Sequence, residues 1–186
     1  MVEKLETERE IQIDWRPYYL RPNTPPEGSE LPAHVRARMA GVHDRLRQMA
    51  RAAGMDMVFP ARMPNTRFAH EATEYARAHG KLLEFHRILF RLYYAEGQDI
   101  GSWHVLRAAA QETGLDSDEM QREVESGKYT AAVEEQIGEA QEIGITGVPT
   151  YIFGDMYAIV GAQPYEVFER VLARLADEAA GPKEES

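Results

Sequence analysis

The chain has 186 residues, of which 44% are hydrophobic and 28% are charged. This length suits one globular domain, with or without an insertion, and is sufficient for a hydrophobic core. Its formal net charge of −10 argues against a nucleic-acid partner, and the lack of any long apolar run argues against a membrane partner. The absence of cysteine excludes disulfides and thiolate metal ligands. The N-terminus is charged throughout and cannot be a signal peptide, so that both features favour a cytoplasmic location.

The first 32 residues are predicted to form a helix end, a strand and a loop. Residues 2–10 are typical of the end of an amphipathic helix, and residues 11–15 alternate between apolar and polar side chains, which predicts a strand. Arg16-Pro17 ends this strand. The four prolines and one glycine of residues 18–32 leave no room for a regular element, so a loop follows.

The middle of the chain, residues 33–127, is predicted to form a run of helices without a strand. The segments expected to be helical are 33–53, 66–79, 81–95, 99–110 and 116–127. Segment 81–95 is rich in aromatic residues, which core packing explains without a cofactor. Asp99 and Asp116 are predicted to cap the helices that follow them.

The first of these helices, 33–53, has an apolar side and several arginines. Its apolar positions share one face and are Val35, Met39, Val42, Leu46 and Met49. The arginines at 36, 38, 45, 47 and 51 are predicted to lie on the opposite face, where they are solvated. We therefore interpret them as an ordinary helix surface and not as a binding patch.

The C-terminal part is predicted to contain a helix over 128–143, a β-hairpin and a last helix. Short β-branched and aromatic runs at 150–153 and 156–160 flank Gly154-Asp155, a pair suited to a tight hairpin turn. Pro164 suits the first turn of the last helix, and from residue 177 onward a frayed tail is expected.

The dipeptide Val148-Pro149, directly before the hairpin, is the most interesting local feature. A cis peptide bond there would turn the Val148 backbone outward, free to pair with an extended substrate. The alternative is an ordinary trans proline at the start of an edge strand.

Several segments in the same order carry a resemblance to a known family. They are residues 13–22, Asn65-Thr66-Arg67, residues 90–101, and residues 144–164 with Gly-Ile-Thr-Gly-Val-Pro-Thr. Together they resemble the FrnE-like branch of the DsbA family, which is related to 2-hydroxychromene-2-carboxylate isomerases and kappa-class glutathione transferases. The resemblance implies an α/β, thioredoxin-like fold with an inserted all-helical domain. Residues 1–32 and 128–180 would form the thioredoxin-like domain, 33–127 the helical insertion, and 181–186 a disordered tail.

The resemblance also implies site residues. Val148, Pro149 and Thr150 match the loop with which family members bind the substrate backbone. The Cys-x-x-Cys turn of the redox members has no counterpart here and is expected upstream of residue 1, so no catalytic residue and no cofactor is assigned. Without the first strand of the family, the remaining strands would expose edges, which predicts pairing into a homodimer or aggregation.

Three functions are compatible with this pattern. The first is a DsbA-like thiol-disulfide oxidoreductase acting on protein thiols or disulfides. The second is a glutathione-dependent isomerase or transferase of the 2-hydroxychromene-2-carboxylate isomerase type, which binds glutathione through the same loop. The third is a non-catalytic binding module. An upstream Cys-x-x-Cys would favour the first, a single upstream Ser the second, and a true start at Met1 the third.

Other chemistry finds little support. His70-Glu71 matches the start of a zinc-protease motif, but position 74 is Glu, so the second histidine is absent and no metal is expected. Ser102 is interpreted as a residue of a helix first turn and not as a nucleophile.

Overall fold

Two hydrophobic cores divide the chain into two units, residues 1–20 with 137–186 and residues 21–136. The computed structural model describes residues 2–9, 11–52, 54–154 and 156–179. The segment predicted as a helical insertion, 33–127, falls within the second unit. The tail expected at 181–186 lies outside the described residues.

The first unit is built on the predicted β-hairpin, which is confirmed. Strand β3 (Thr150–Phe153) pairs antiparallel with β4 (Tyr157–Val160), in a register that sets Thr150 opposite Val160. Gly154 has a positive φ of 52°, which the hairpin turn requires and which favours glycine. Residue 155 of the predicted turn lies outside the described part of the chain.

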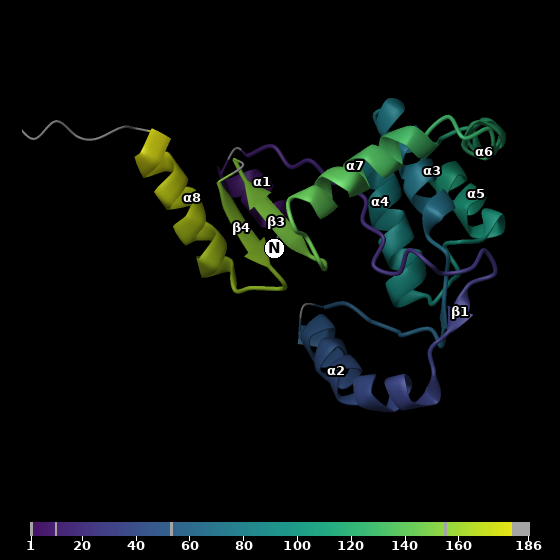
Figure 1. Ribbon diagram of the computed structural model, residues 1–186, viewed down its shortest axis with the longest axis horizontal. Helices are drawn as coiled ribbons and strands as arrows, with labels where there is room; N and C mark the ends of the chain where they lie inside the picture. Colours follow the sequence, from purple (N-terminus) through teal and green to yellow (C-terminus); the bar gives the residue numbers. More distant parts are fainter. Residues whose placement is uncertain (1, 10, 53, 155, 180–186) are drawn as a thin grey trace, which may run out of the picture. The chain divides into compact units, whose positions relative to one another are not determined.

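One face of the hairpin packs on two helices (Figure 1). These are α1 (Val2–Arg9) and α8 (Tyr165–Ala179), and the core they share centres on Phe168. The Phe168 ring is fully buried and meets the ring of Tyr151 edge to face, with 4.8 Å between centroids. Burial of this one aromatic face holds the hairpin, which would be marginal alone, in a fixed position.

Helix α8 continues to Ala179, although a frayed tail is predicted from residue 177 onward. The prediction is therefore wrong for residues 177–179. The reason is a pair of contacts made by Glu178. Its carboxylate accepts a hydrogen bond from the Tyr157 hydroxyl of β4 and pairs with Arg174 one turn earlier at 3.1 Å. These contacts tie the last turn of the helix to the hairpin.

The strand predicted over residues 11–15 is a second correction. The segment is extended but forms no strand, because no neighbouring strand among the described residues pairs with it. The predicted alternation is still present: Ile11, Ile13 and Trp15 are half-buried, whereas Gln12 and Asp14 are exposed. The alternation of apolar and polar residues therefore predicted correctly which side chains are more buried. It could not predict whether the segment pairs with a second strand by backbone hydrogen bonds.

The second unit is a helical assembly with one hydrophobic core. Its helices are α2 (Ala33–Ala52), α3 (Arg67–Ala78), α4 (Leu82–Phe90), α5 (Trp103–Glu112) and α6 (Ser117–Glu125), and α7 (Thr130–Glu142) runs from this unit into the first. The core lies between α3, α4, α5 and α6 and contains the predicted apolar face of segment 81–95, including Phe85 and Leu89. That segment ends in a π-helical turn, η1 (Arg91–Ala95), which was not predicted.

A short strand pair in this unit also departs from the prediction of loop and helix alone. Strand β1 (Ser29–Glu30) pairs with β2 (Arg62–Met63) as an isolated two-residue bridge. Gly28, with a φ of 77°, precedes β1, and a Cβ there would lie 2.7 Å from the Met63 carbonyl oxygen. Pairs this short carry no periodicity, so the sequence pattern cannot indicate them.

The two predicted aspartate caps differ in outcome. Asp116 caps α6 as predicted, because its Oδ1 accepts from the backbone N–H groups of Asp118 and Glu119, each at 2.9 Å. Asp99 caps no helix, because α5 begins four residues later and Ser102 occupies the position before it. Asp99 instead accepts from the N–H of Gly101 at 2.8 Å, within a turn.

Two histidines of this unit are expected to make stability depend on pH. Burial lowers the pKa of His70 and of His86 to about 4, from 6.5, and the nearby His86 adds to the effect on His70. The unfolded chain therefore binds more protons than the folded one between pH 4 and 6.5, so stability is lost as the pH falls through this window. We expect the free energy of unfolding to drop by about 1–2 kcal/mol per histidine from pH 7 to 5.

Urea titrations at pH 7 and pH 5 measure this drop, in a window where ordinary carboxylates stay ionised. His70→Gln should flatten the dependence, whereas substitution of the exposed His104 by Gln should leave it unchanged. Equal pH dependence in wild type and H70Q would contradict the assignment.

No helix in the described part of the chain is both long enough and apolar enough to cross a membrane.

Candidate functional site

The loop between α7 and β3, residues 143–149, is fixed at both of its ends. The Val148–Pro149 peptide bond is cis. The Pro149 carbonyl accepts a hydrogen bond from the N–H of Gly161 at 2.8 Å, which extends the hairpin pairing to the proline. The Thr150 hydroxyl donates to the Gly147 carbonyl at 2.8 Å and so closes the turn around the cis bond.

The extended segment at residues 11–20 supports the same loop from a distant part of the sequence. The Tyr18 hydroxyl donates to the Ile145 carbonyl at 3.1 Å. Arg16 pairs with Asp14 at 3.0 Å and with Glu139 of α7, and these hydrogen bonds, the one to Asp14 foremost, raise the pKa of its guanidinium. The loop is therefore positioned by a helix, a hairpin and this segment together.

Val148 is the open point of the loop. Its side chain is 52% exposed, and among the described residues none forms a hydrogen bond with its backbone N–H or carbonyl. Strand β3 pairs with β4 on one side, and no described strand lies along its other side. An extended chain could therefore pair with Val148 and continue along β3 by backbone hydrogen bonds.

The loop exposes backbone groups at Val148 but has no side chain that could react. Residues 144–150 contain no ionisable side chain, and the Thr150 hydroxyl is engaged with Gly147. The structure thus brings Val148, Pro149 and Thr150 together at one exposed turn, while their role in substrate binding stays a prediction.

The other positions singled out from the sequence have structural roles. Glu74 forms an ion pair with Arg77 at 3.0 Å, and no group of three acidic or histidine side chains in the described ranges could hold a metal ion. Ser102 lies directly before α5, at the N-cap position, and not within the first turn as predicted. His70 is a half-buried histidine of α3.

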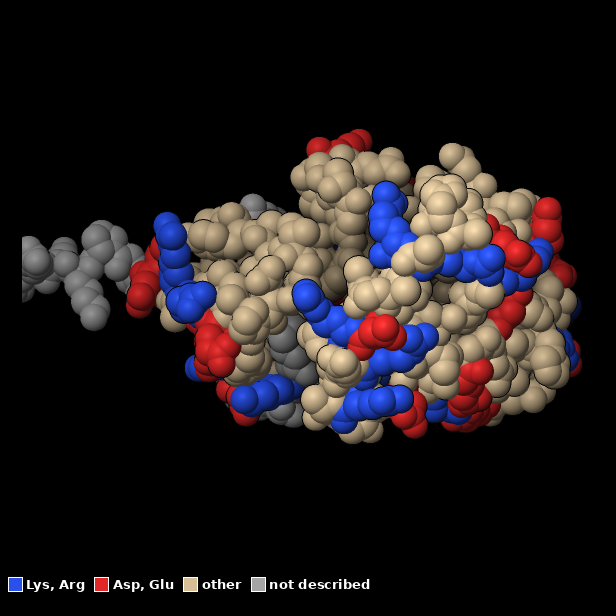
Figure 2. All heavy atoms as spheres, turned by 90° about the horizontal axis from the view of Figure 1, so that it is seen from below, with Lys and Arg blue, Asp and Glu red and all other residues tan. Residues whose placement is uncertain are grey.

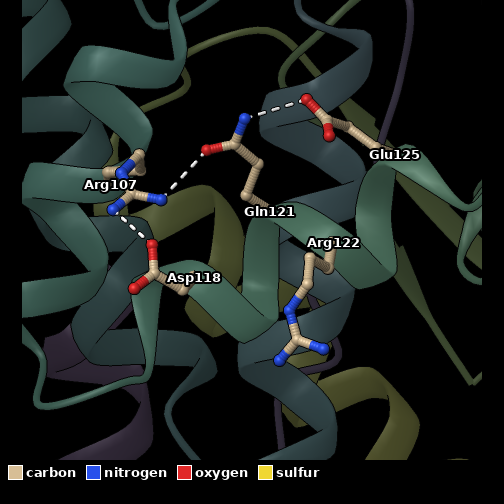
Figure 3. A pocket seen from close by; sticks show the side chains of 5 residues that line it. All are labelled: Arg107, Asp118, Gln121, Arg122 and Glu125. Atoms are coloured by element: carbon tan, nitrogen blue, oxygen red, sulfur yellow. Dashed lines mark hydrogen bonds and ion pairs between the residues drawn. The ribbon is translucent and has the colours of Figure 1, made fainter.

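A shallow polar pocket of about 340 Å³ lies on α5 and α6, lined by Arg107, Asp118, Gln121, Arg122 and Glu125. Figure 3 shows that most of these side chains satisfy one another. Arg107 donates to the Gln121 amide oxygen at 3.0 Å and pairs with Asp118, and Gln121 in turn donates to Glu125 at 2.9 Å. Because four of the five side chains already pair with one another, we assign no function to this pocket.

Two supporting residues of the loop, Tyr18 and Gly161, were not identified as site residues from the sequence. Both belong to segments that carry the family resemblance, but their contact with the loop arises from tertiary pairing. Tyr18 lies 127 residues from its partner, Ile145, so no local spacing could have indicated it.

Comparison with known proteins places this fold in a family. The model of the DSBA-like thioredoxin domain matches residues 1–173. The Bacillus subtilis (strain 168) protein YwbO is 29% identical over 168 residues, which cover 89% of this chain and 82% of YwbO.

Two solved structures share the fold, each with a TM-score of 0.78. One is the probable DsbA oxidoreductase from Streptomyces coelicolor, 21% identical, with 92% of this chain and 76% of that chain covered. The other is a 2-hydroxychromene-2-carboxylate isomerase, 22% identical, with 96% of this chain and 88% of that chain covered. The predicted DsbA-like thioredoxin fold is thereby confirmed, and the chain belongs to the DSBA-like thioredoxin domain family.

Proposed function

We propose that this chain is a DsbA-type thiol-disulfide oxidoreductase domain whose loop at Val148, Pro149 and Thr150 binds the backbone of a protein thiol or disulfide substrate. The observation that carries the proposal is the open backbone of Val148, beside the free side of β3, in a loop fixed by contacts from three elements. Membership in the DSBA-like thioredoxin domain family supports a thiol-disulfide reaction.

Residues 1–186 supply only the binding part of this activity. Thiol-disulfide exchange needs a thiolate that attacks one sulfur and releases the other. Residues 1–186 contain no cysteine, so we expect them not to accelerate the reduction of insulin by dithiothreitol. Reading the thirty codons ahead of Met1 tests the proposal: an encoded Cys-x-x-Cys supports it, and a lone Ser at that place contradicts it.

A glutathione-dependent isomerase is the second candidate, because a solved isomerase shares the fold over 96% of this chain. Two unreactive probes separate the candidates by binding. Insulin B chain with alkylated cysteines represents a protein substrate, and S-methylglutathione represents glutathione. We expect the B chain to bind, and binding of S-methylglutathione alone would favour the isomerase.

Substitution of Val148 tests whether backbone pairing carries this binding. Val148→Pro removes the backbone donor, and we expect affinity for the alkylated B chain to fall at least tenfold. Val148→Ala keeps the donor and removes only the exposed side chain, so its affinity should stay within about threefold. Fluorescence anisotropy gives both values, and an equal loss in V148A and V148P would show that the side chain, not the backbone, makes the contact.

We also propose that the hairpin pairs between two copies of this chain. The side of β4 away from β3 is unpaired in the described chain and stays free when a substrate pairs along β3, and Ile152 and Val160 on the outer face are 43% and 64% exposed. Such an edge invites pairing with another strand. Analytical ultracentrifugation of residues 1–186 should show a dimer or larger species, and a stable monomer with intact circular dichroism would exclude this.

A further inference from the structure

Helix α2 carries an apolar seam that follows a coiled-coil repeat. The seam positions are spaced four, three, four and three residues apart, and they are Val35, Met39, Val42, Leu46 and Met49. Such spacing is the a/d pattern of helices that pack along a partner helix. Figure 1 shows α2 at the edge of the second unit, away from the α3, α4 and α5 helices.

The second half of this seam is open to solvent. Val42, Leu46 and Met49 are 47%, 36% and 55% exposed. One flank of the helix is closed by the chain itself, because the His43 ring stacks on Phe59 with 3.9 Å between centroids. The seam is therefore accessible from the other flank.

Arginines occupy that open flank. Arg38 and Arg45 each directly precede a seam residue, so they lie beside the apolar stripe and not opposite it, which corrects the sequence-based prediction for these two. Both are exposed, and no described carboxylate pairs with either. The one acidic residue of α2, Asp44, pairs with Arg47 at 2.9 Å. Figure 2 shows basic side chains gathering over this part of the surface.

The charges select the occupant of the seam. Pairing with α2 of a second copy would set Arg38 and Arg45 against arginines in an antiparallel arrangement, and against His43 and Ala50 in a parallel one. In neither orientation would they meet a carboxylate. A membrane surface is disfavoured because the stripe has only the narrow a/d width and contains no aromatic residue. We propose that the exposed seam of α2 binds an amphipathic helix of another protein that carries glutamate or aspartate beside its apolar stripe.

A synthetic probe peptide tests this proposal on the full chain. The probe has three heptads with Leu at a and d, Glu at e and g, and a fluorescein label. Its glutamates disfavour self-association near neutral pH. A control peptide has Lys in place of every Glu. By fluorescence anisotropy at low salt, we expect the Glu peptide to bind at least tenfold more tightly than the Lys peptide.

Matched variants locate the contact on α2. Arg45→Glu, on the open flank, should weaken binding of the Glu peptide about fivefold, whereas Arg51→Glu, the same change away from the seam, should leave it within twofold. Leu46→Asp should abolish binding with the circular dichroism spectrum unchanged. Equal affinity for both peptides, equal loss in R45E and R51E, or binding to phosphatidylglycerol vesicles with none to the Glu peptide would each overturn the proposal.

Discussion

Replacing Phe168 by alanine is expected to lower the free energy of unfolding of the first unit by about 3–5 kcal/mol. The ring is fully buried between the hairpin and α1, and it contacts both Tyr151 and Phe153. Its loss removes the apolar burial and the aromatic contacts together, and leaves a cavity. Because a hairpin without a packed face is marginally stable, the loop at Val148 should lose its fixed geometry as well.

The same substitution at an exposed phenylalanine provides the control. Phe90 is 51% exposed and contacts His86 and Tyr94 from one side, so Phe90→Ala should cost about 1 kcal/mol or less. Urea titration followed by near-ultraviolet circular dichroism measures both. An F168A variant that is as stable as F90A would contradict the packing assigned to α8.

Replacing Arg67 by methionine is expected to destabilise the helical unit by about 2–3 kcal/mol. Its guanidinium donates to Glu71, whose side chain is fully buried in α3, at 2.8 Å. The same carboxylate oxygen accepts from the Thr130 hydroxyl at 3.0 Å, and the second oxygen has no hydrogen-bond partner among the described residues. Without Arg67, a negative charge would stay buried with a single neutral donor.

The reverse substitution should behave differently. Glu71→Met removes the buried charge itself, and Arg67, half of whose side chain is exposed, can turn to water. We therefore expect the free energy of unfolding of E71M to lie within about 1 kcal/mol of the wild-type value. The double variant R67M/E71M should recover most of the stability that R67M loses. Urea titration of the three variants forms the cycle, and additive effects would show that the two residues act independently.

The sequence-based prediction was most successful where a local rule fixes the backbone. The hairpin followed from Gly154 and its flanking apolar runs, and the α6 cap followed from Asp116. The prediction failed where structure depends on distant partners. Residues 11–15 have the right alternation but no strand to pair with, and the β1–β2 bridge joins segments more than 30 residues apart.

The candidate site shows the same division. Val148, Pro149 and Thr150 could be named because they lie together in a segment that carries the family resemblance, whereas the support from Tyr18 depends on folding. In the sequence, His70-Glu71 is an incomplete metal motif. The structure shows instead that Glu71 is buried and forms an ion pair with Arg67. Arg67 belongs to the Asn65-Thr66-Arg67 segment, which carries part of the family resemblance. Burial of a charge has no signature in composition or spacing.

The central claim is that substrate backbone pairs with the loop before β3. Two-dimensional ¹⁵N NMR of the chain during titration with alkylated insulin B chain tests it most directly. We expect the largest amide shifts at Gly147, Val148 and Thr150, with smaller ones along β3, and no comparable change on α5 or α6. Binding that leaves these amides unmoved and shifts another surface would contradict it.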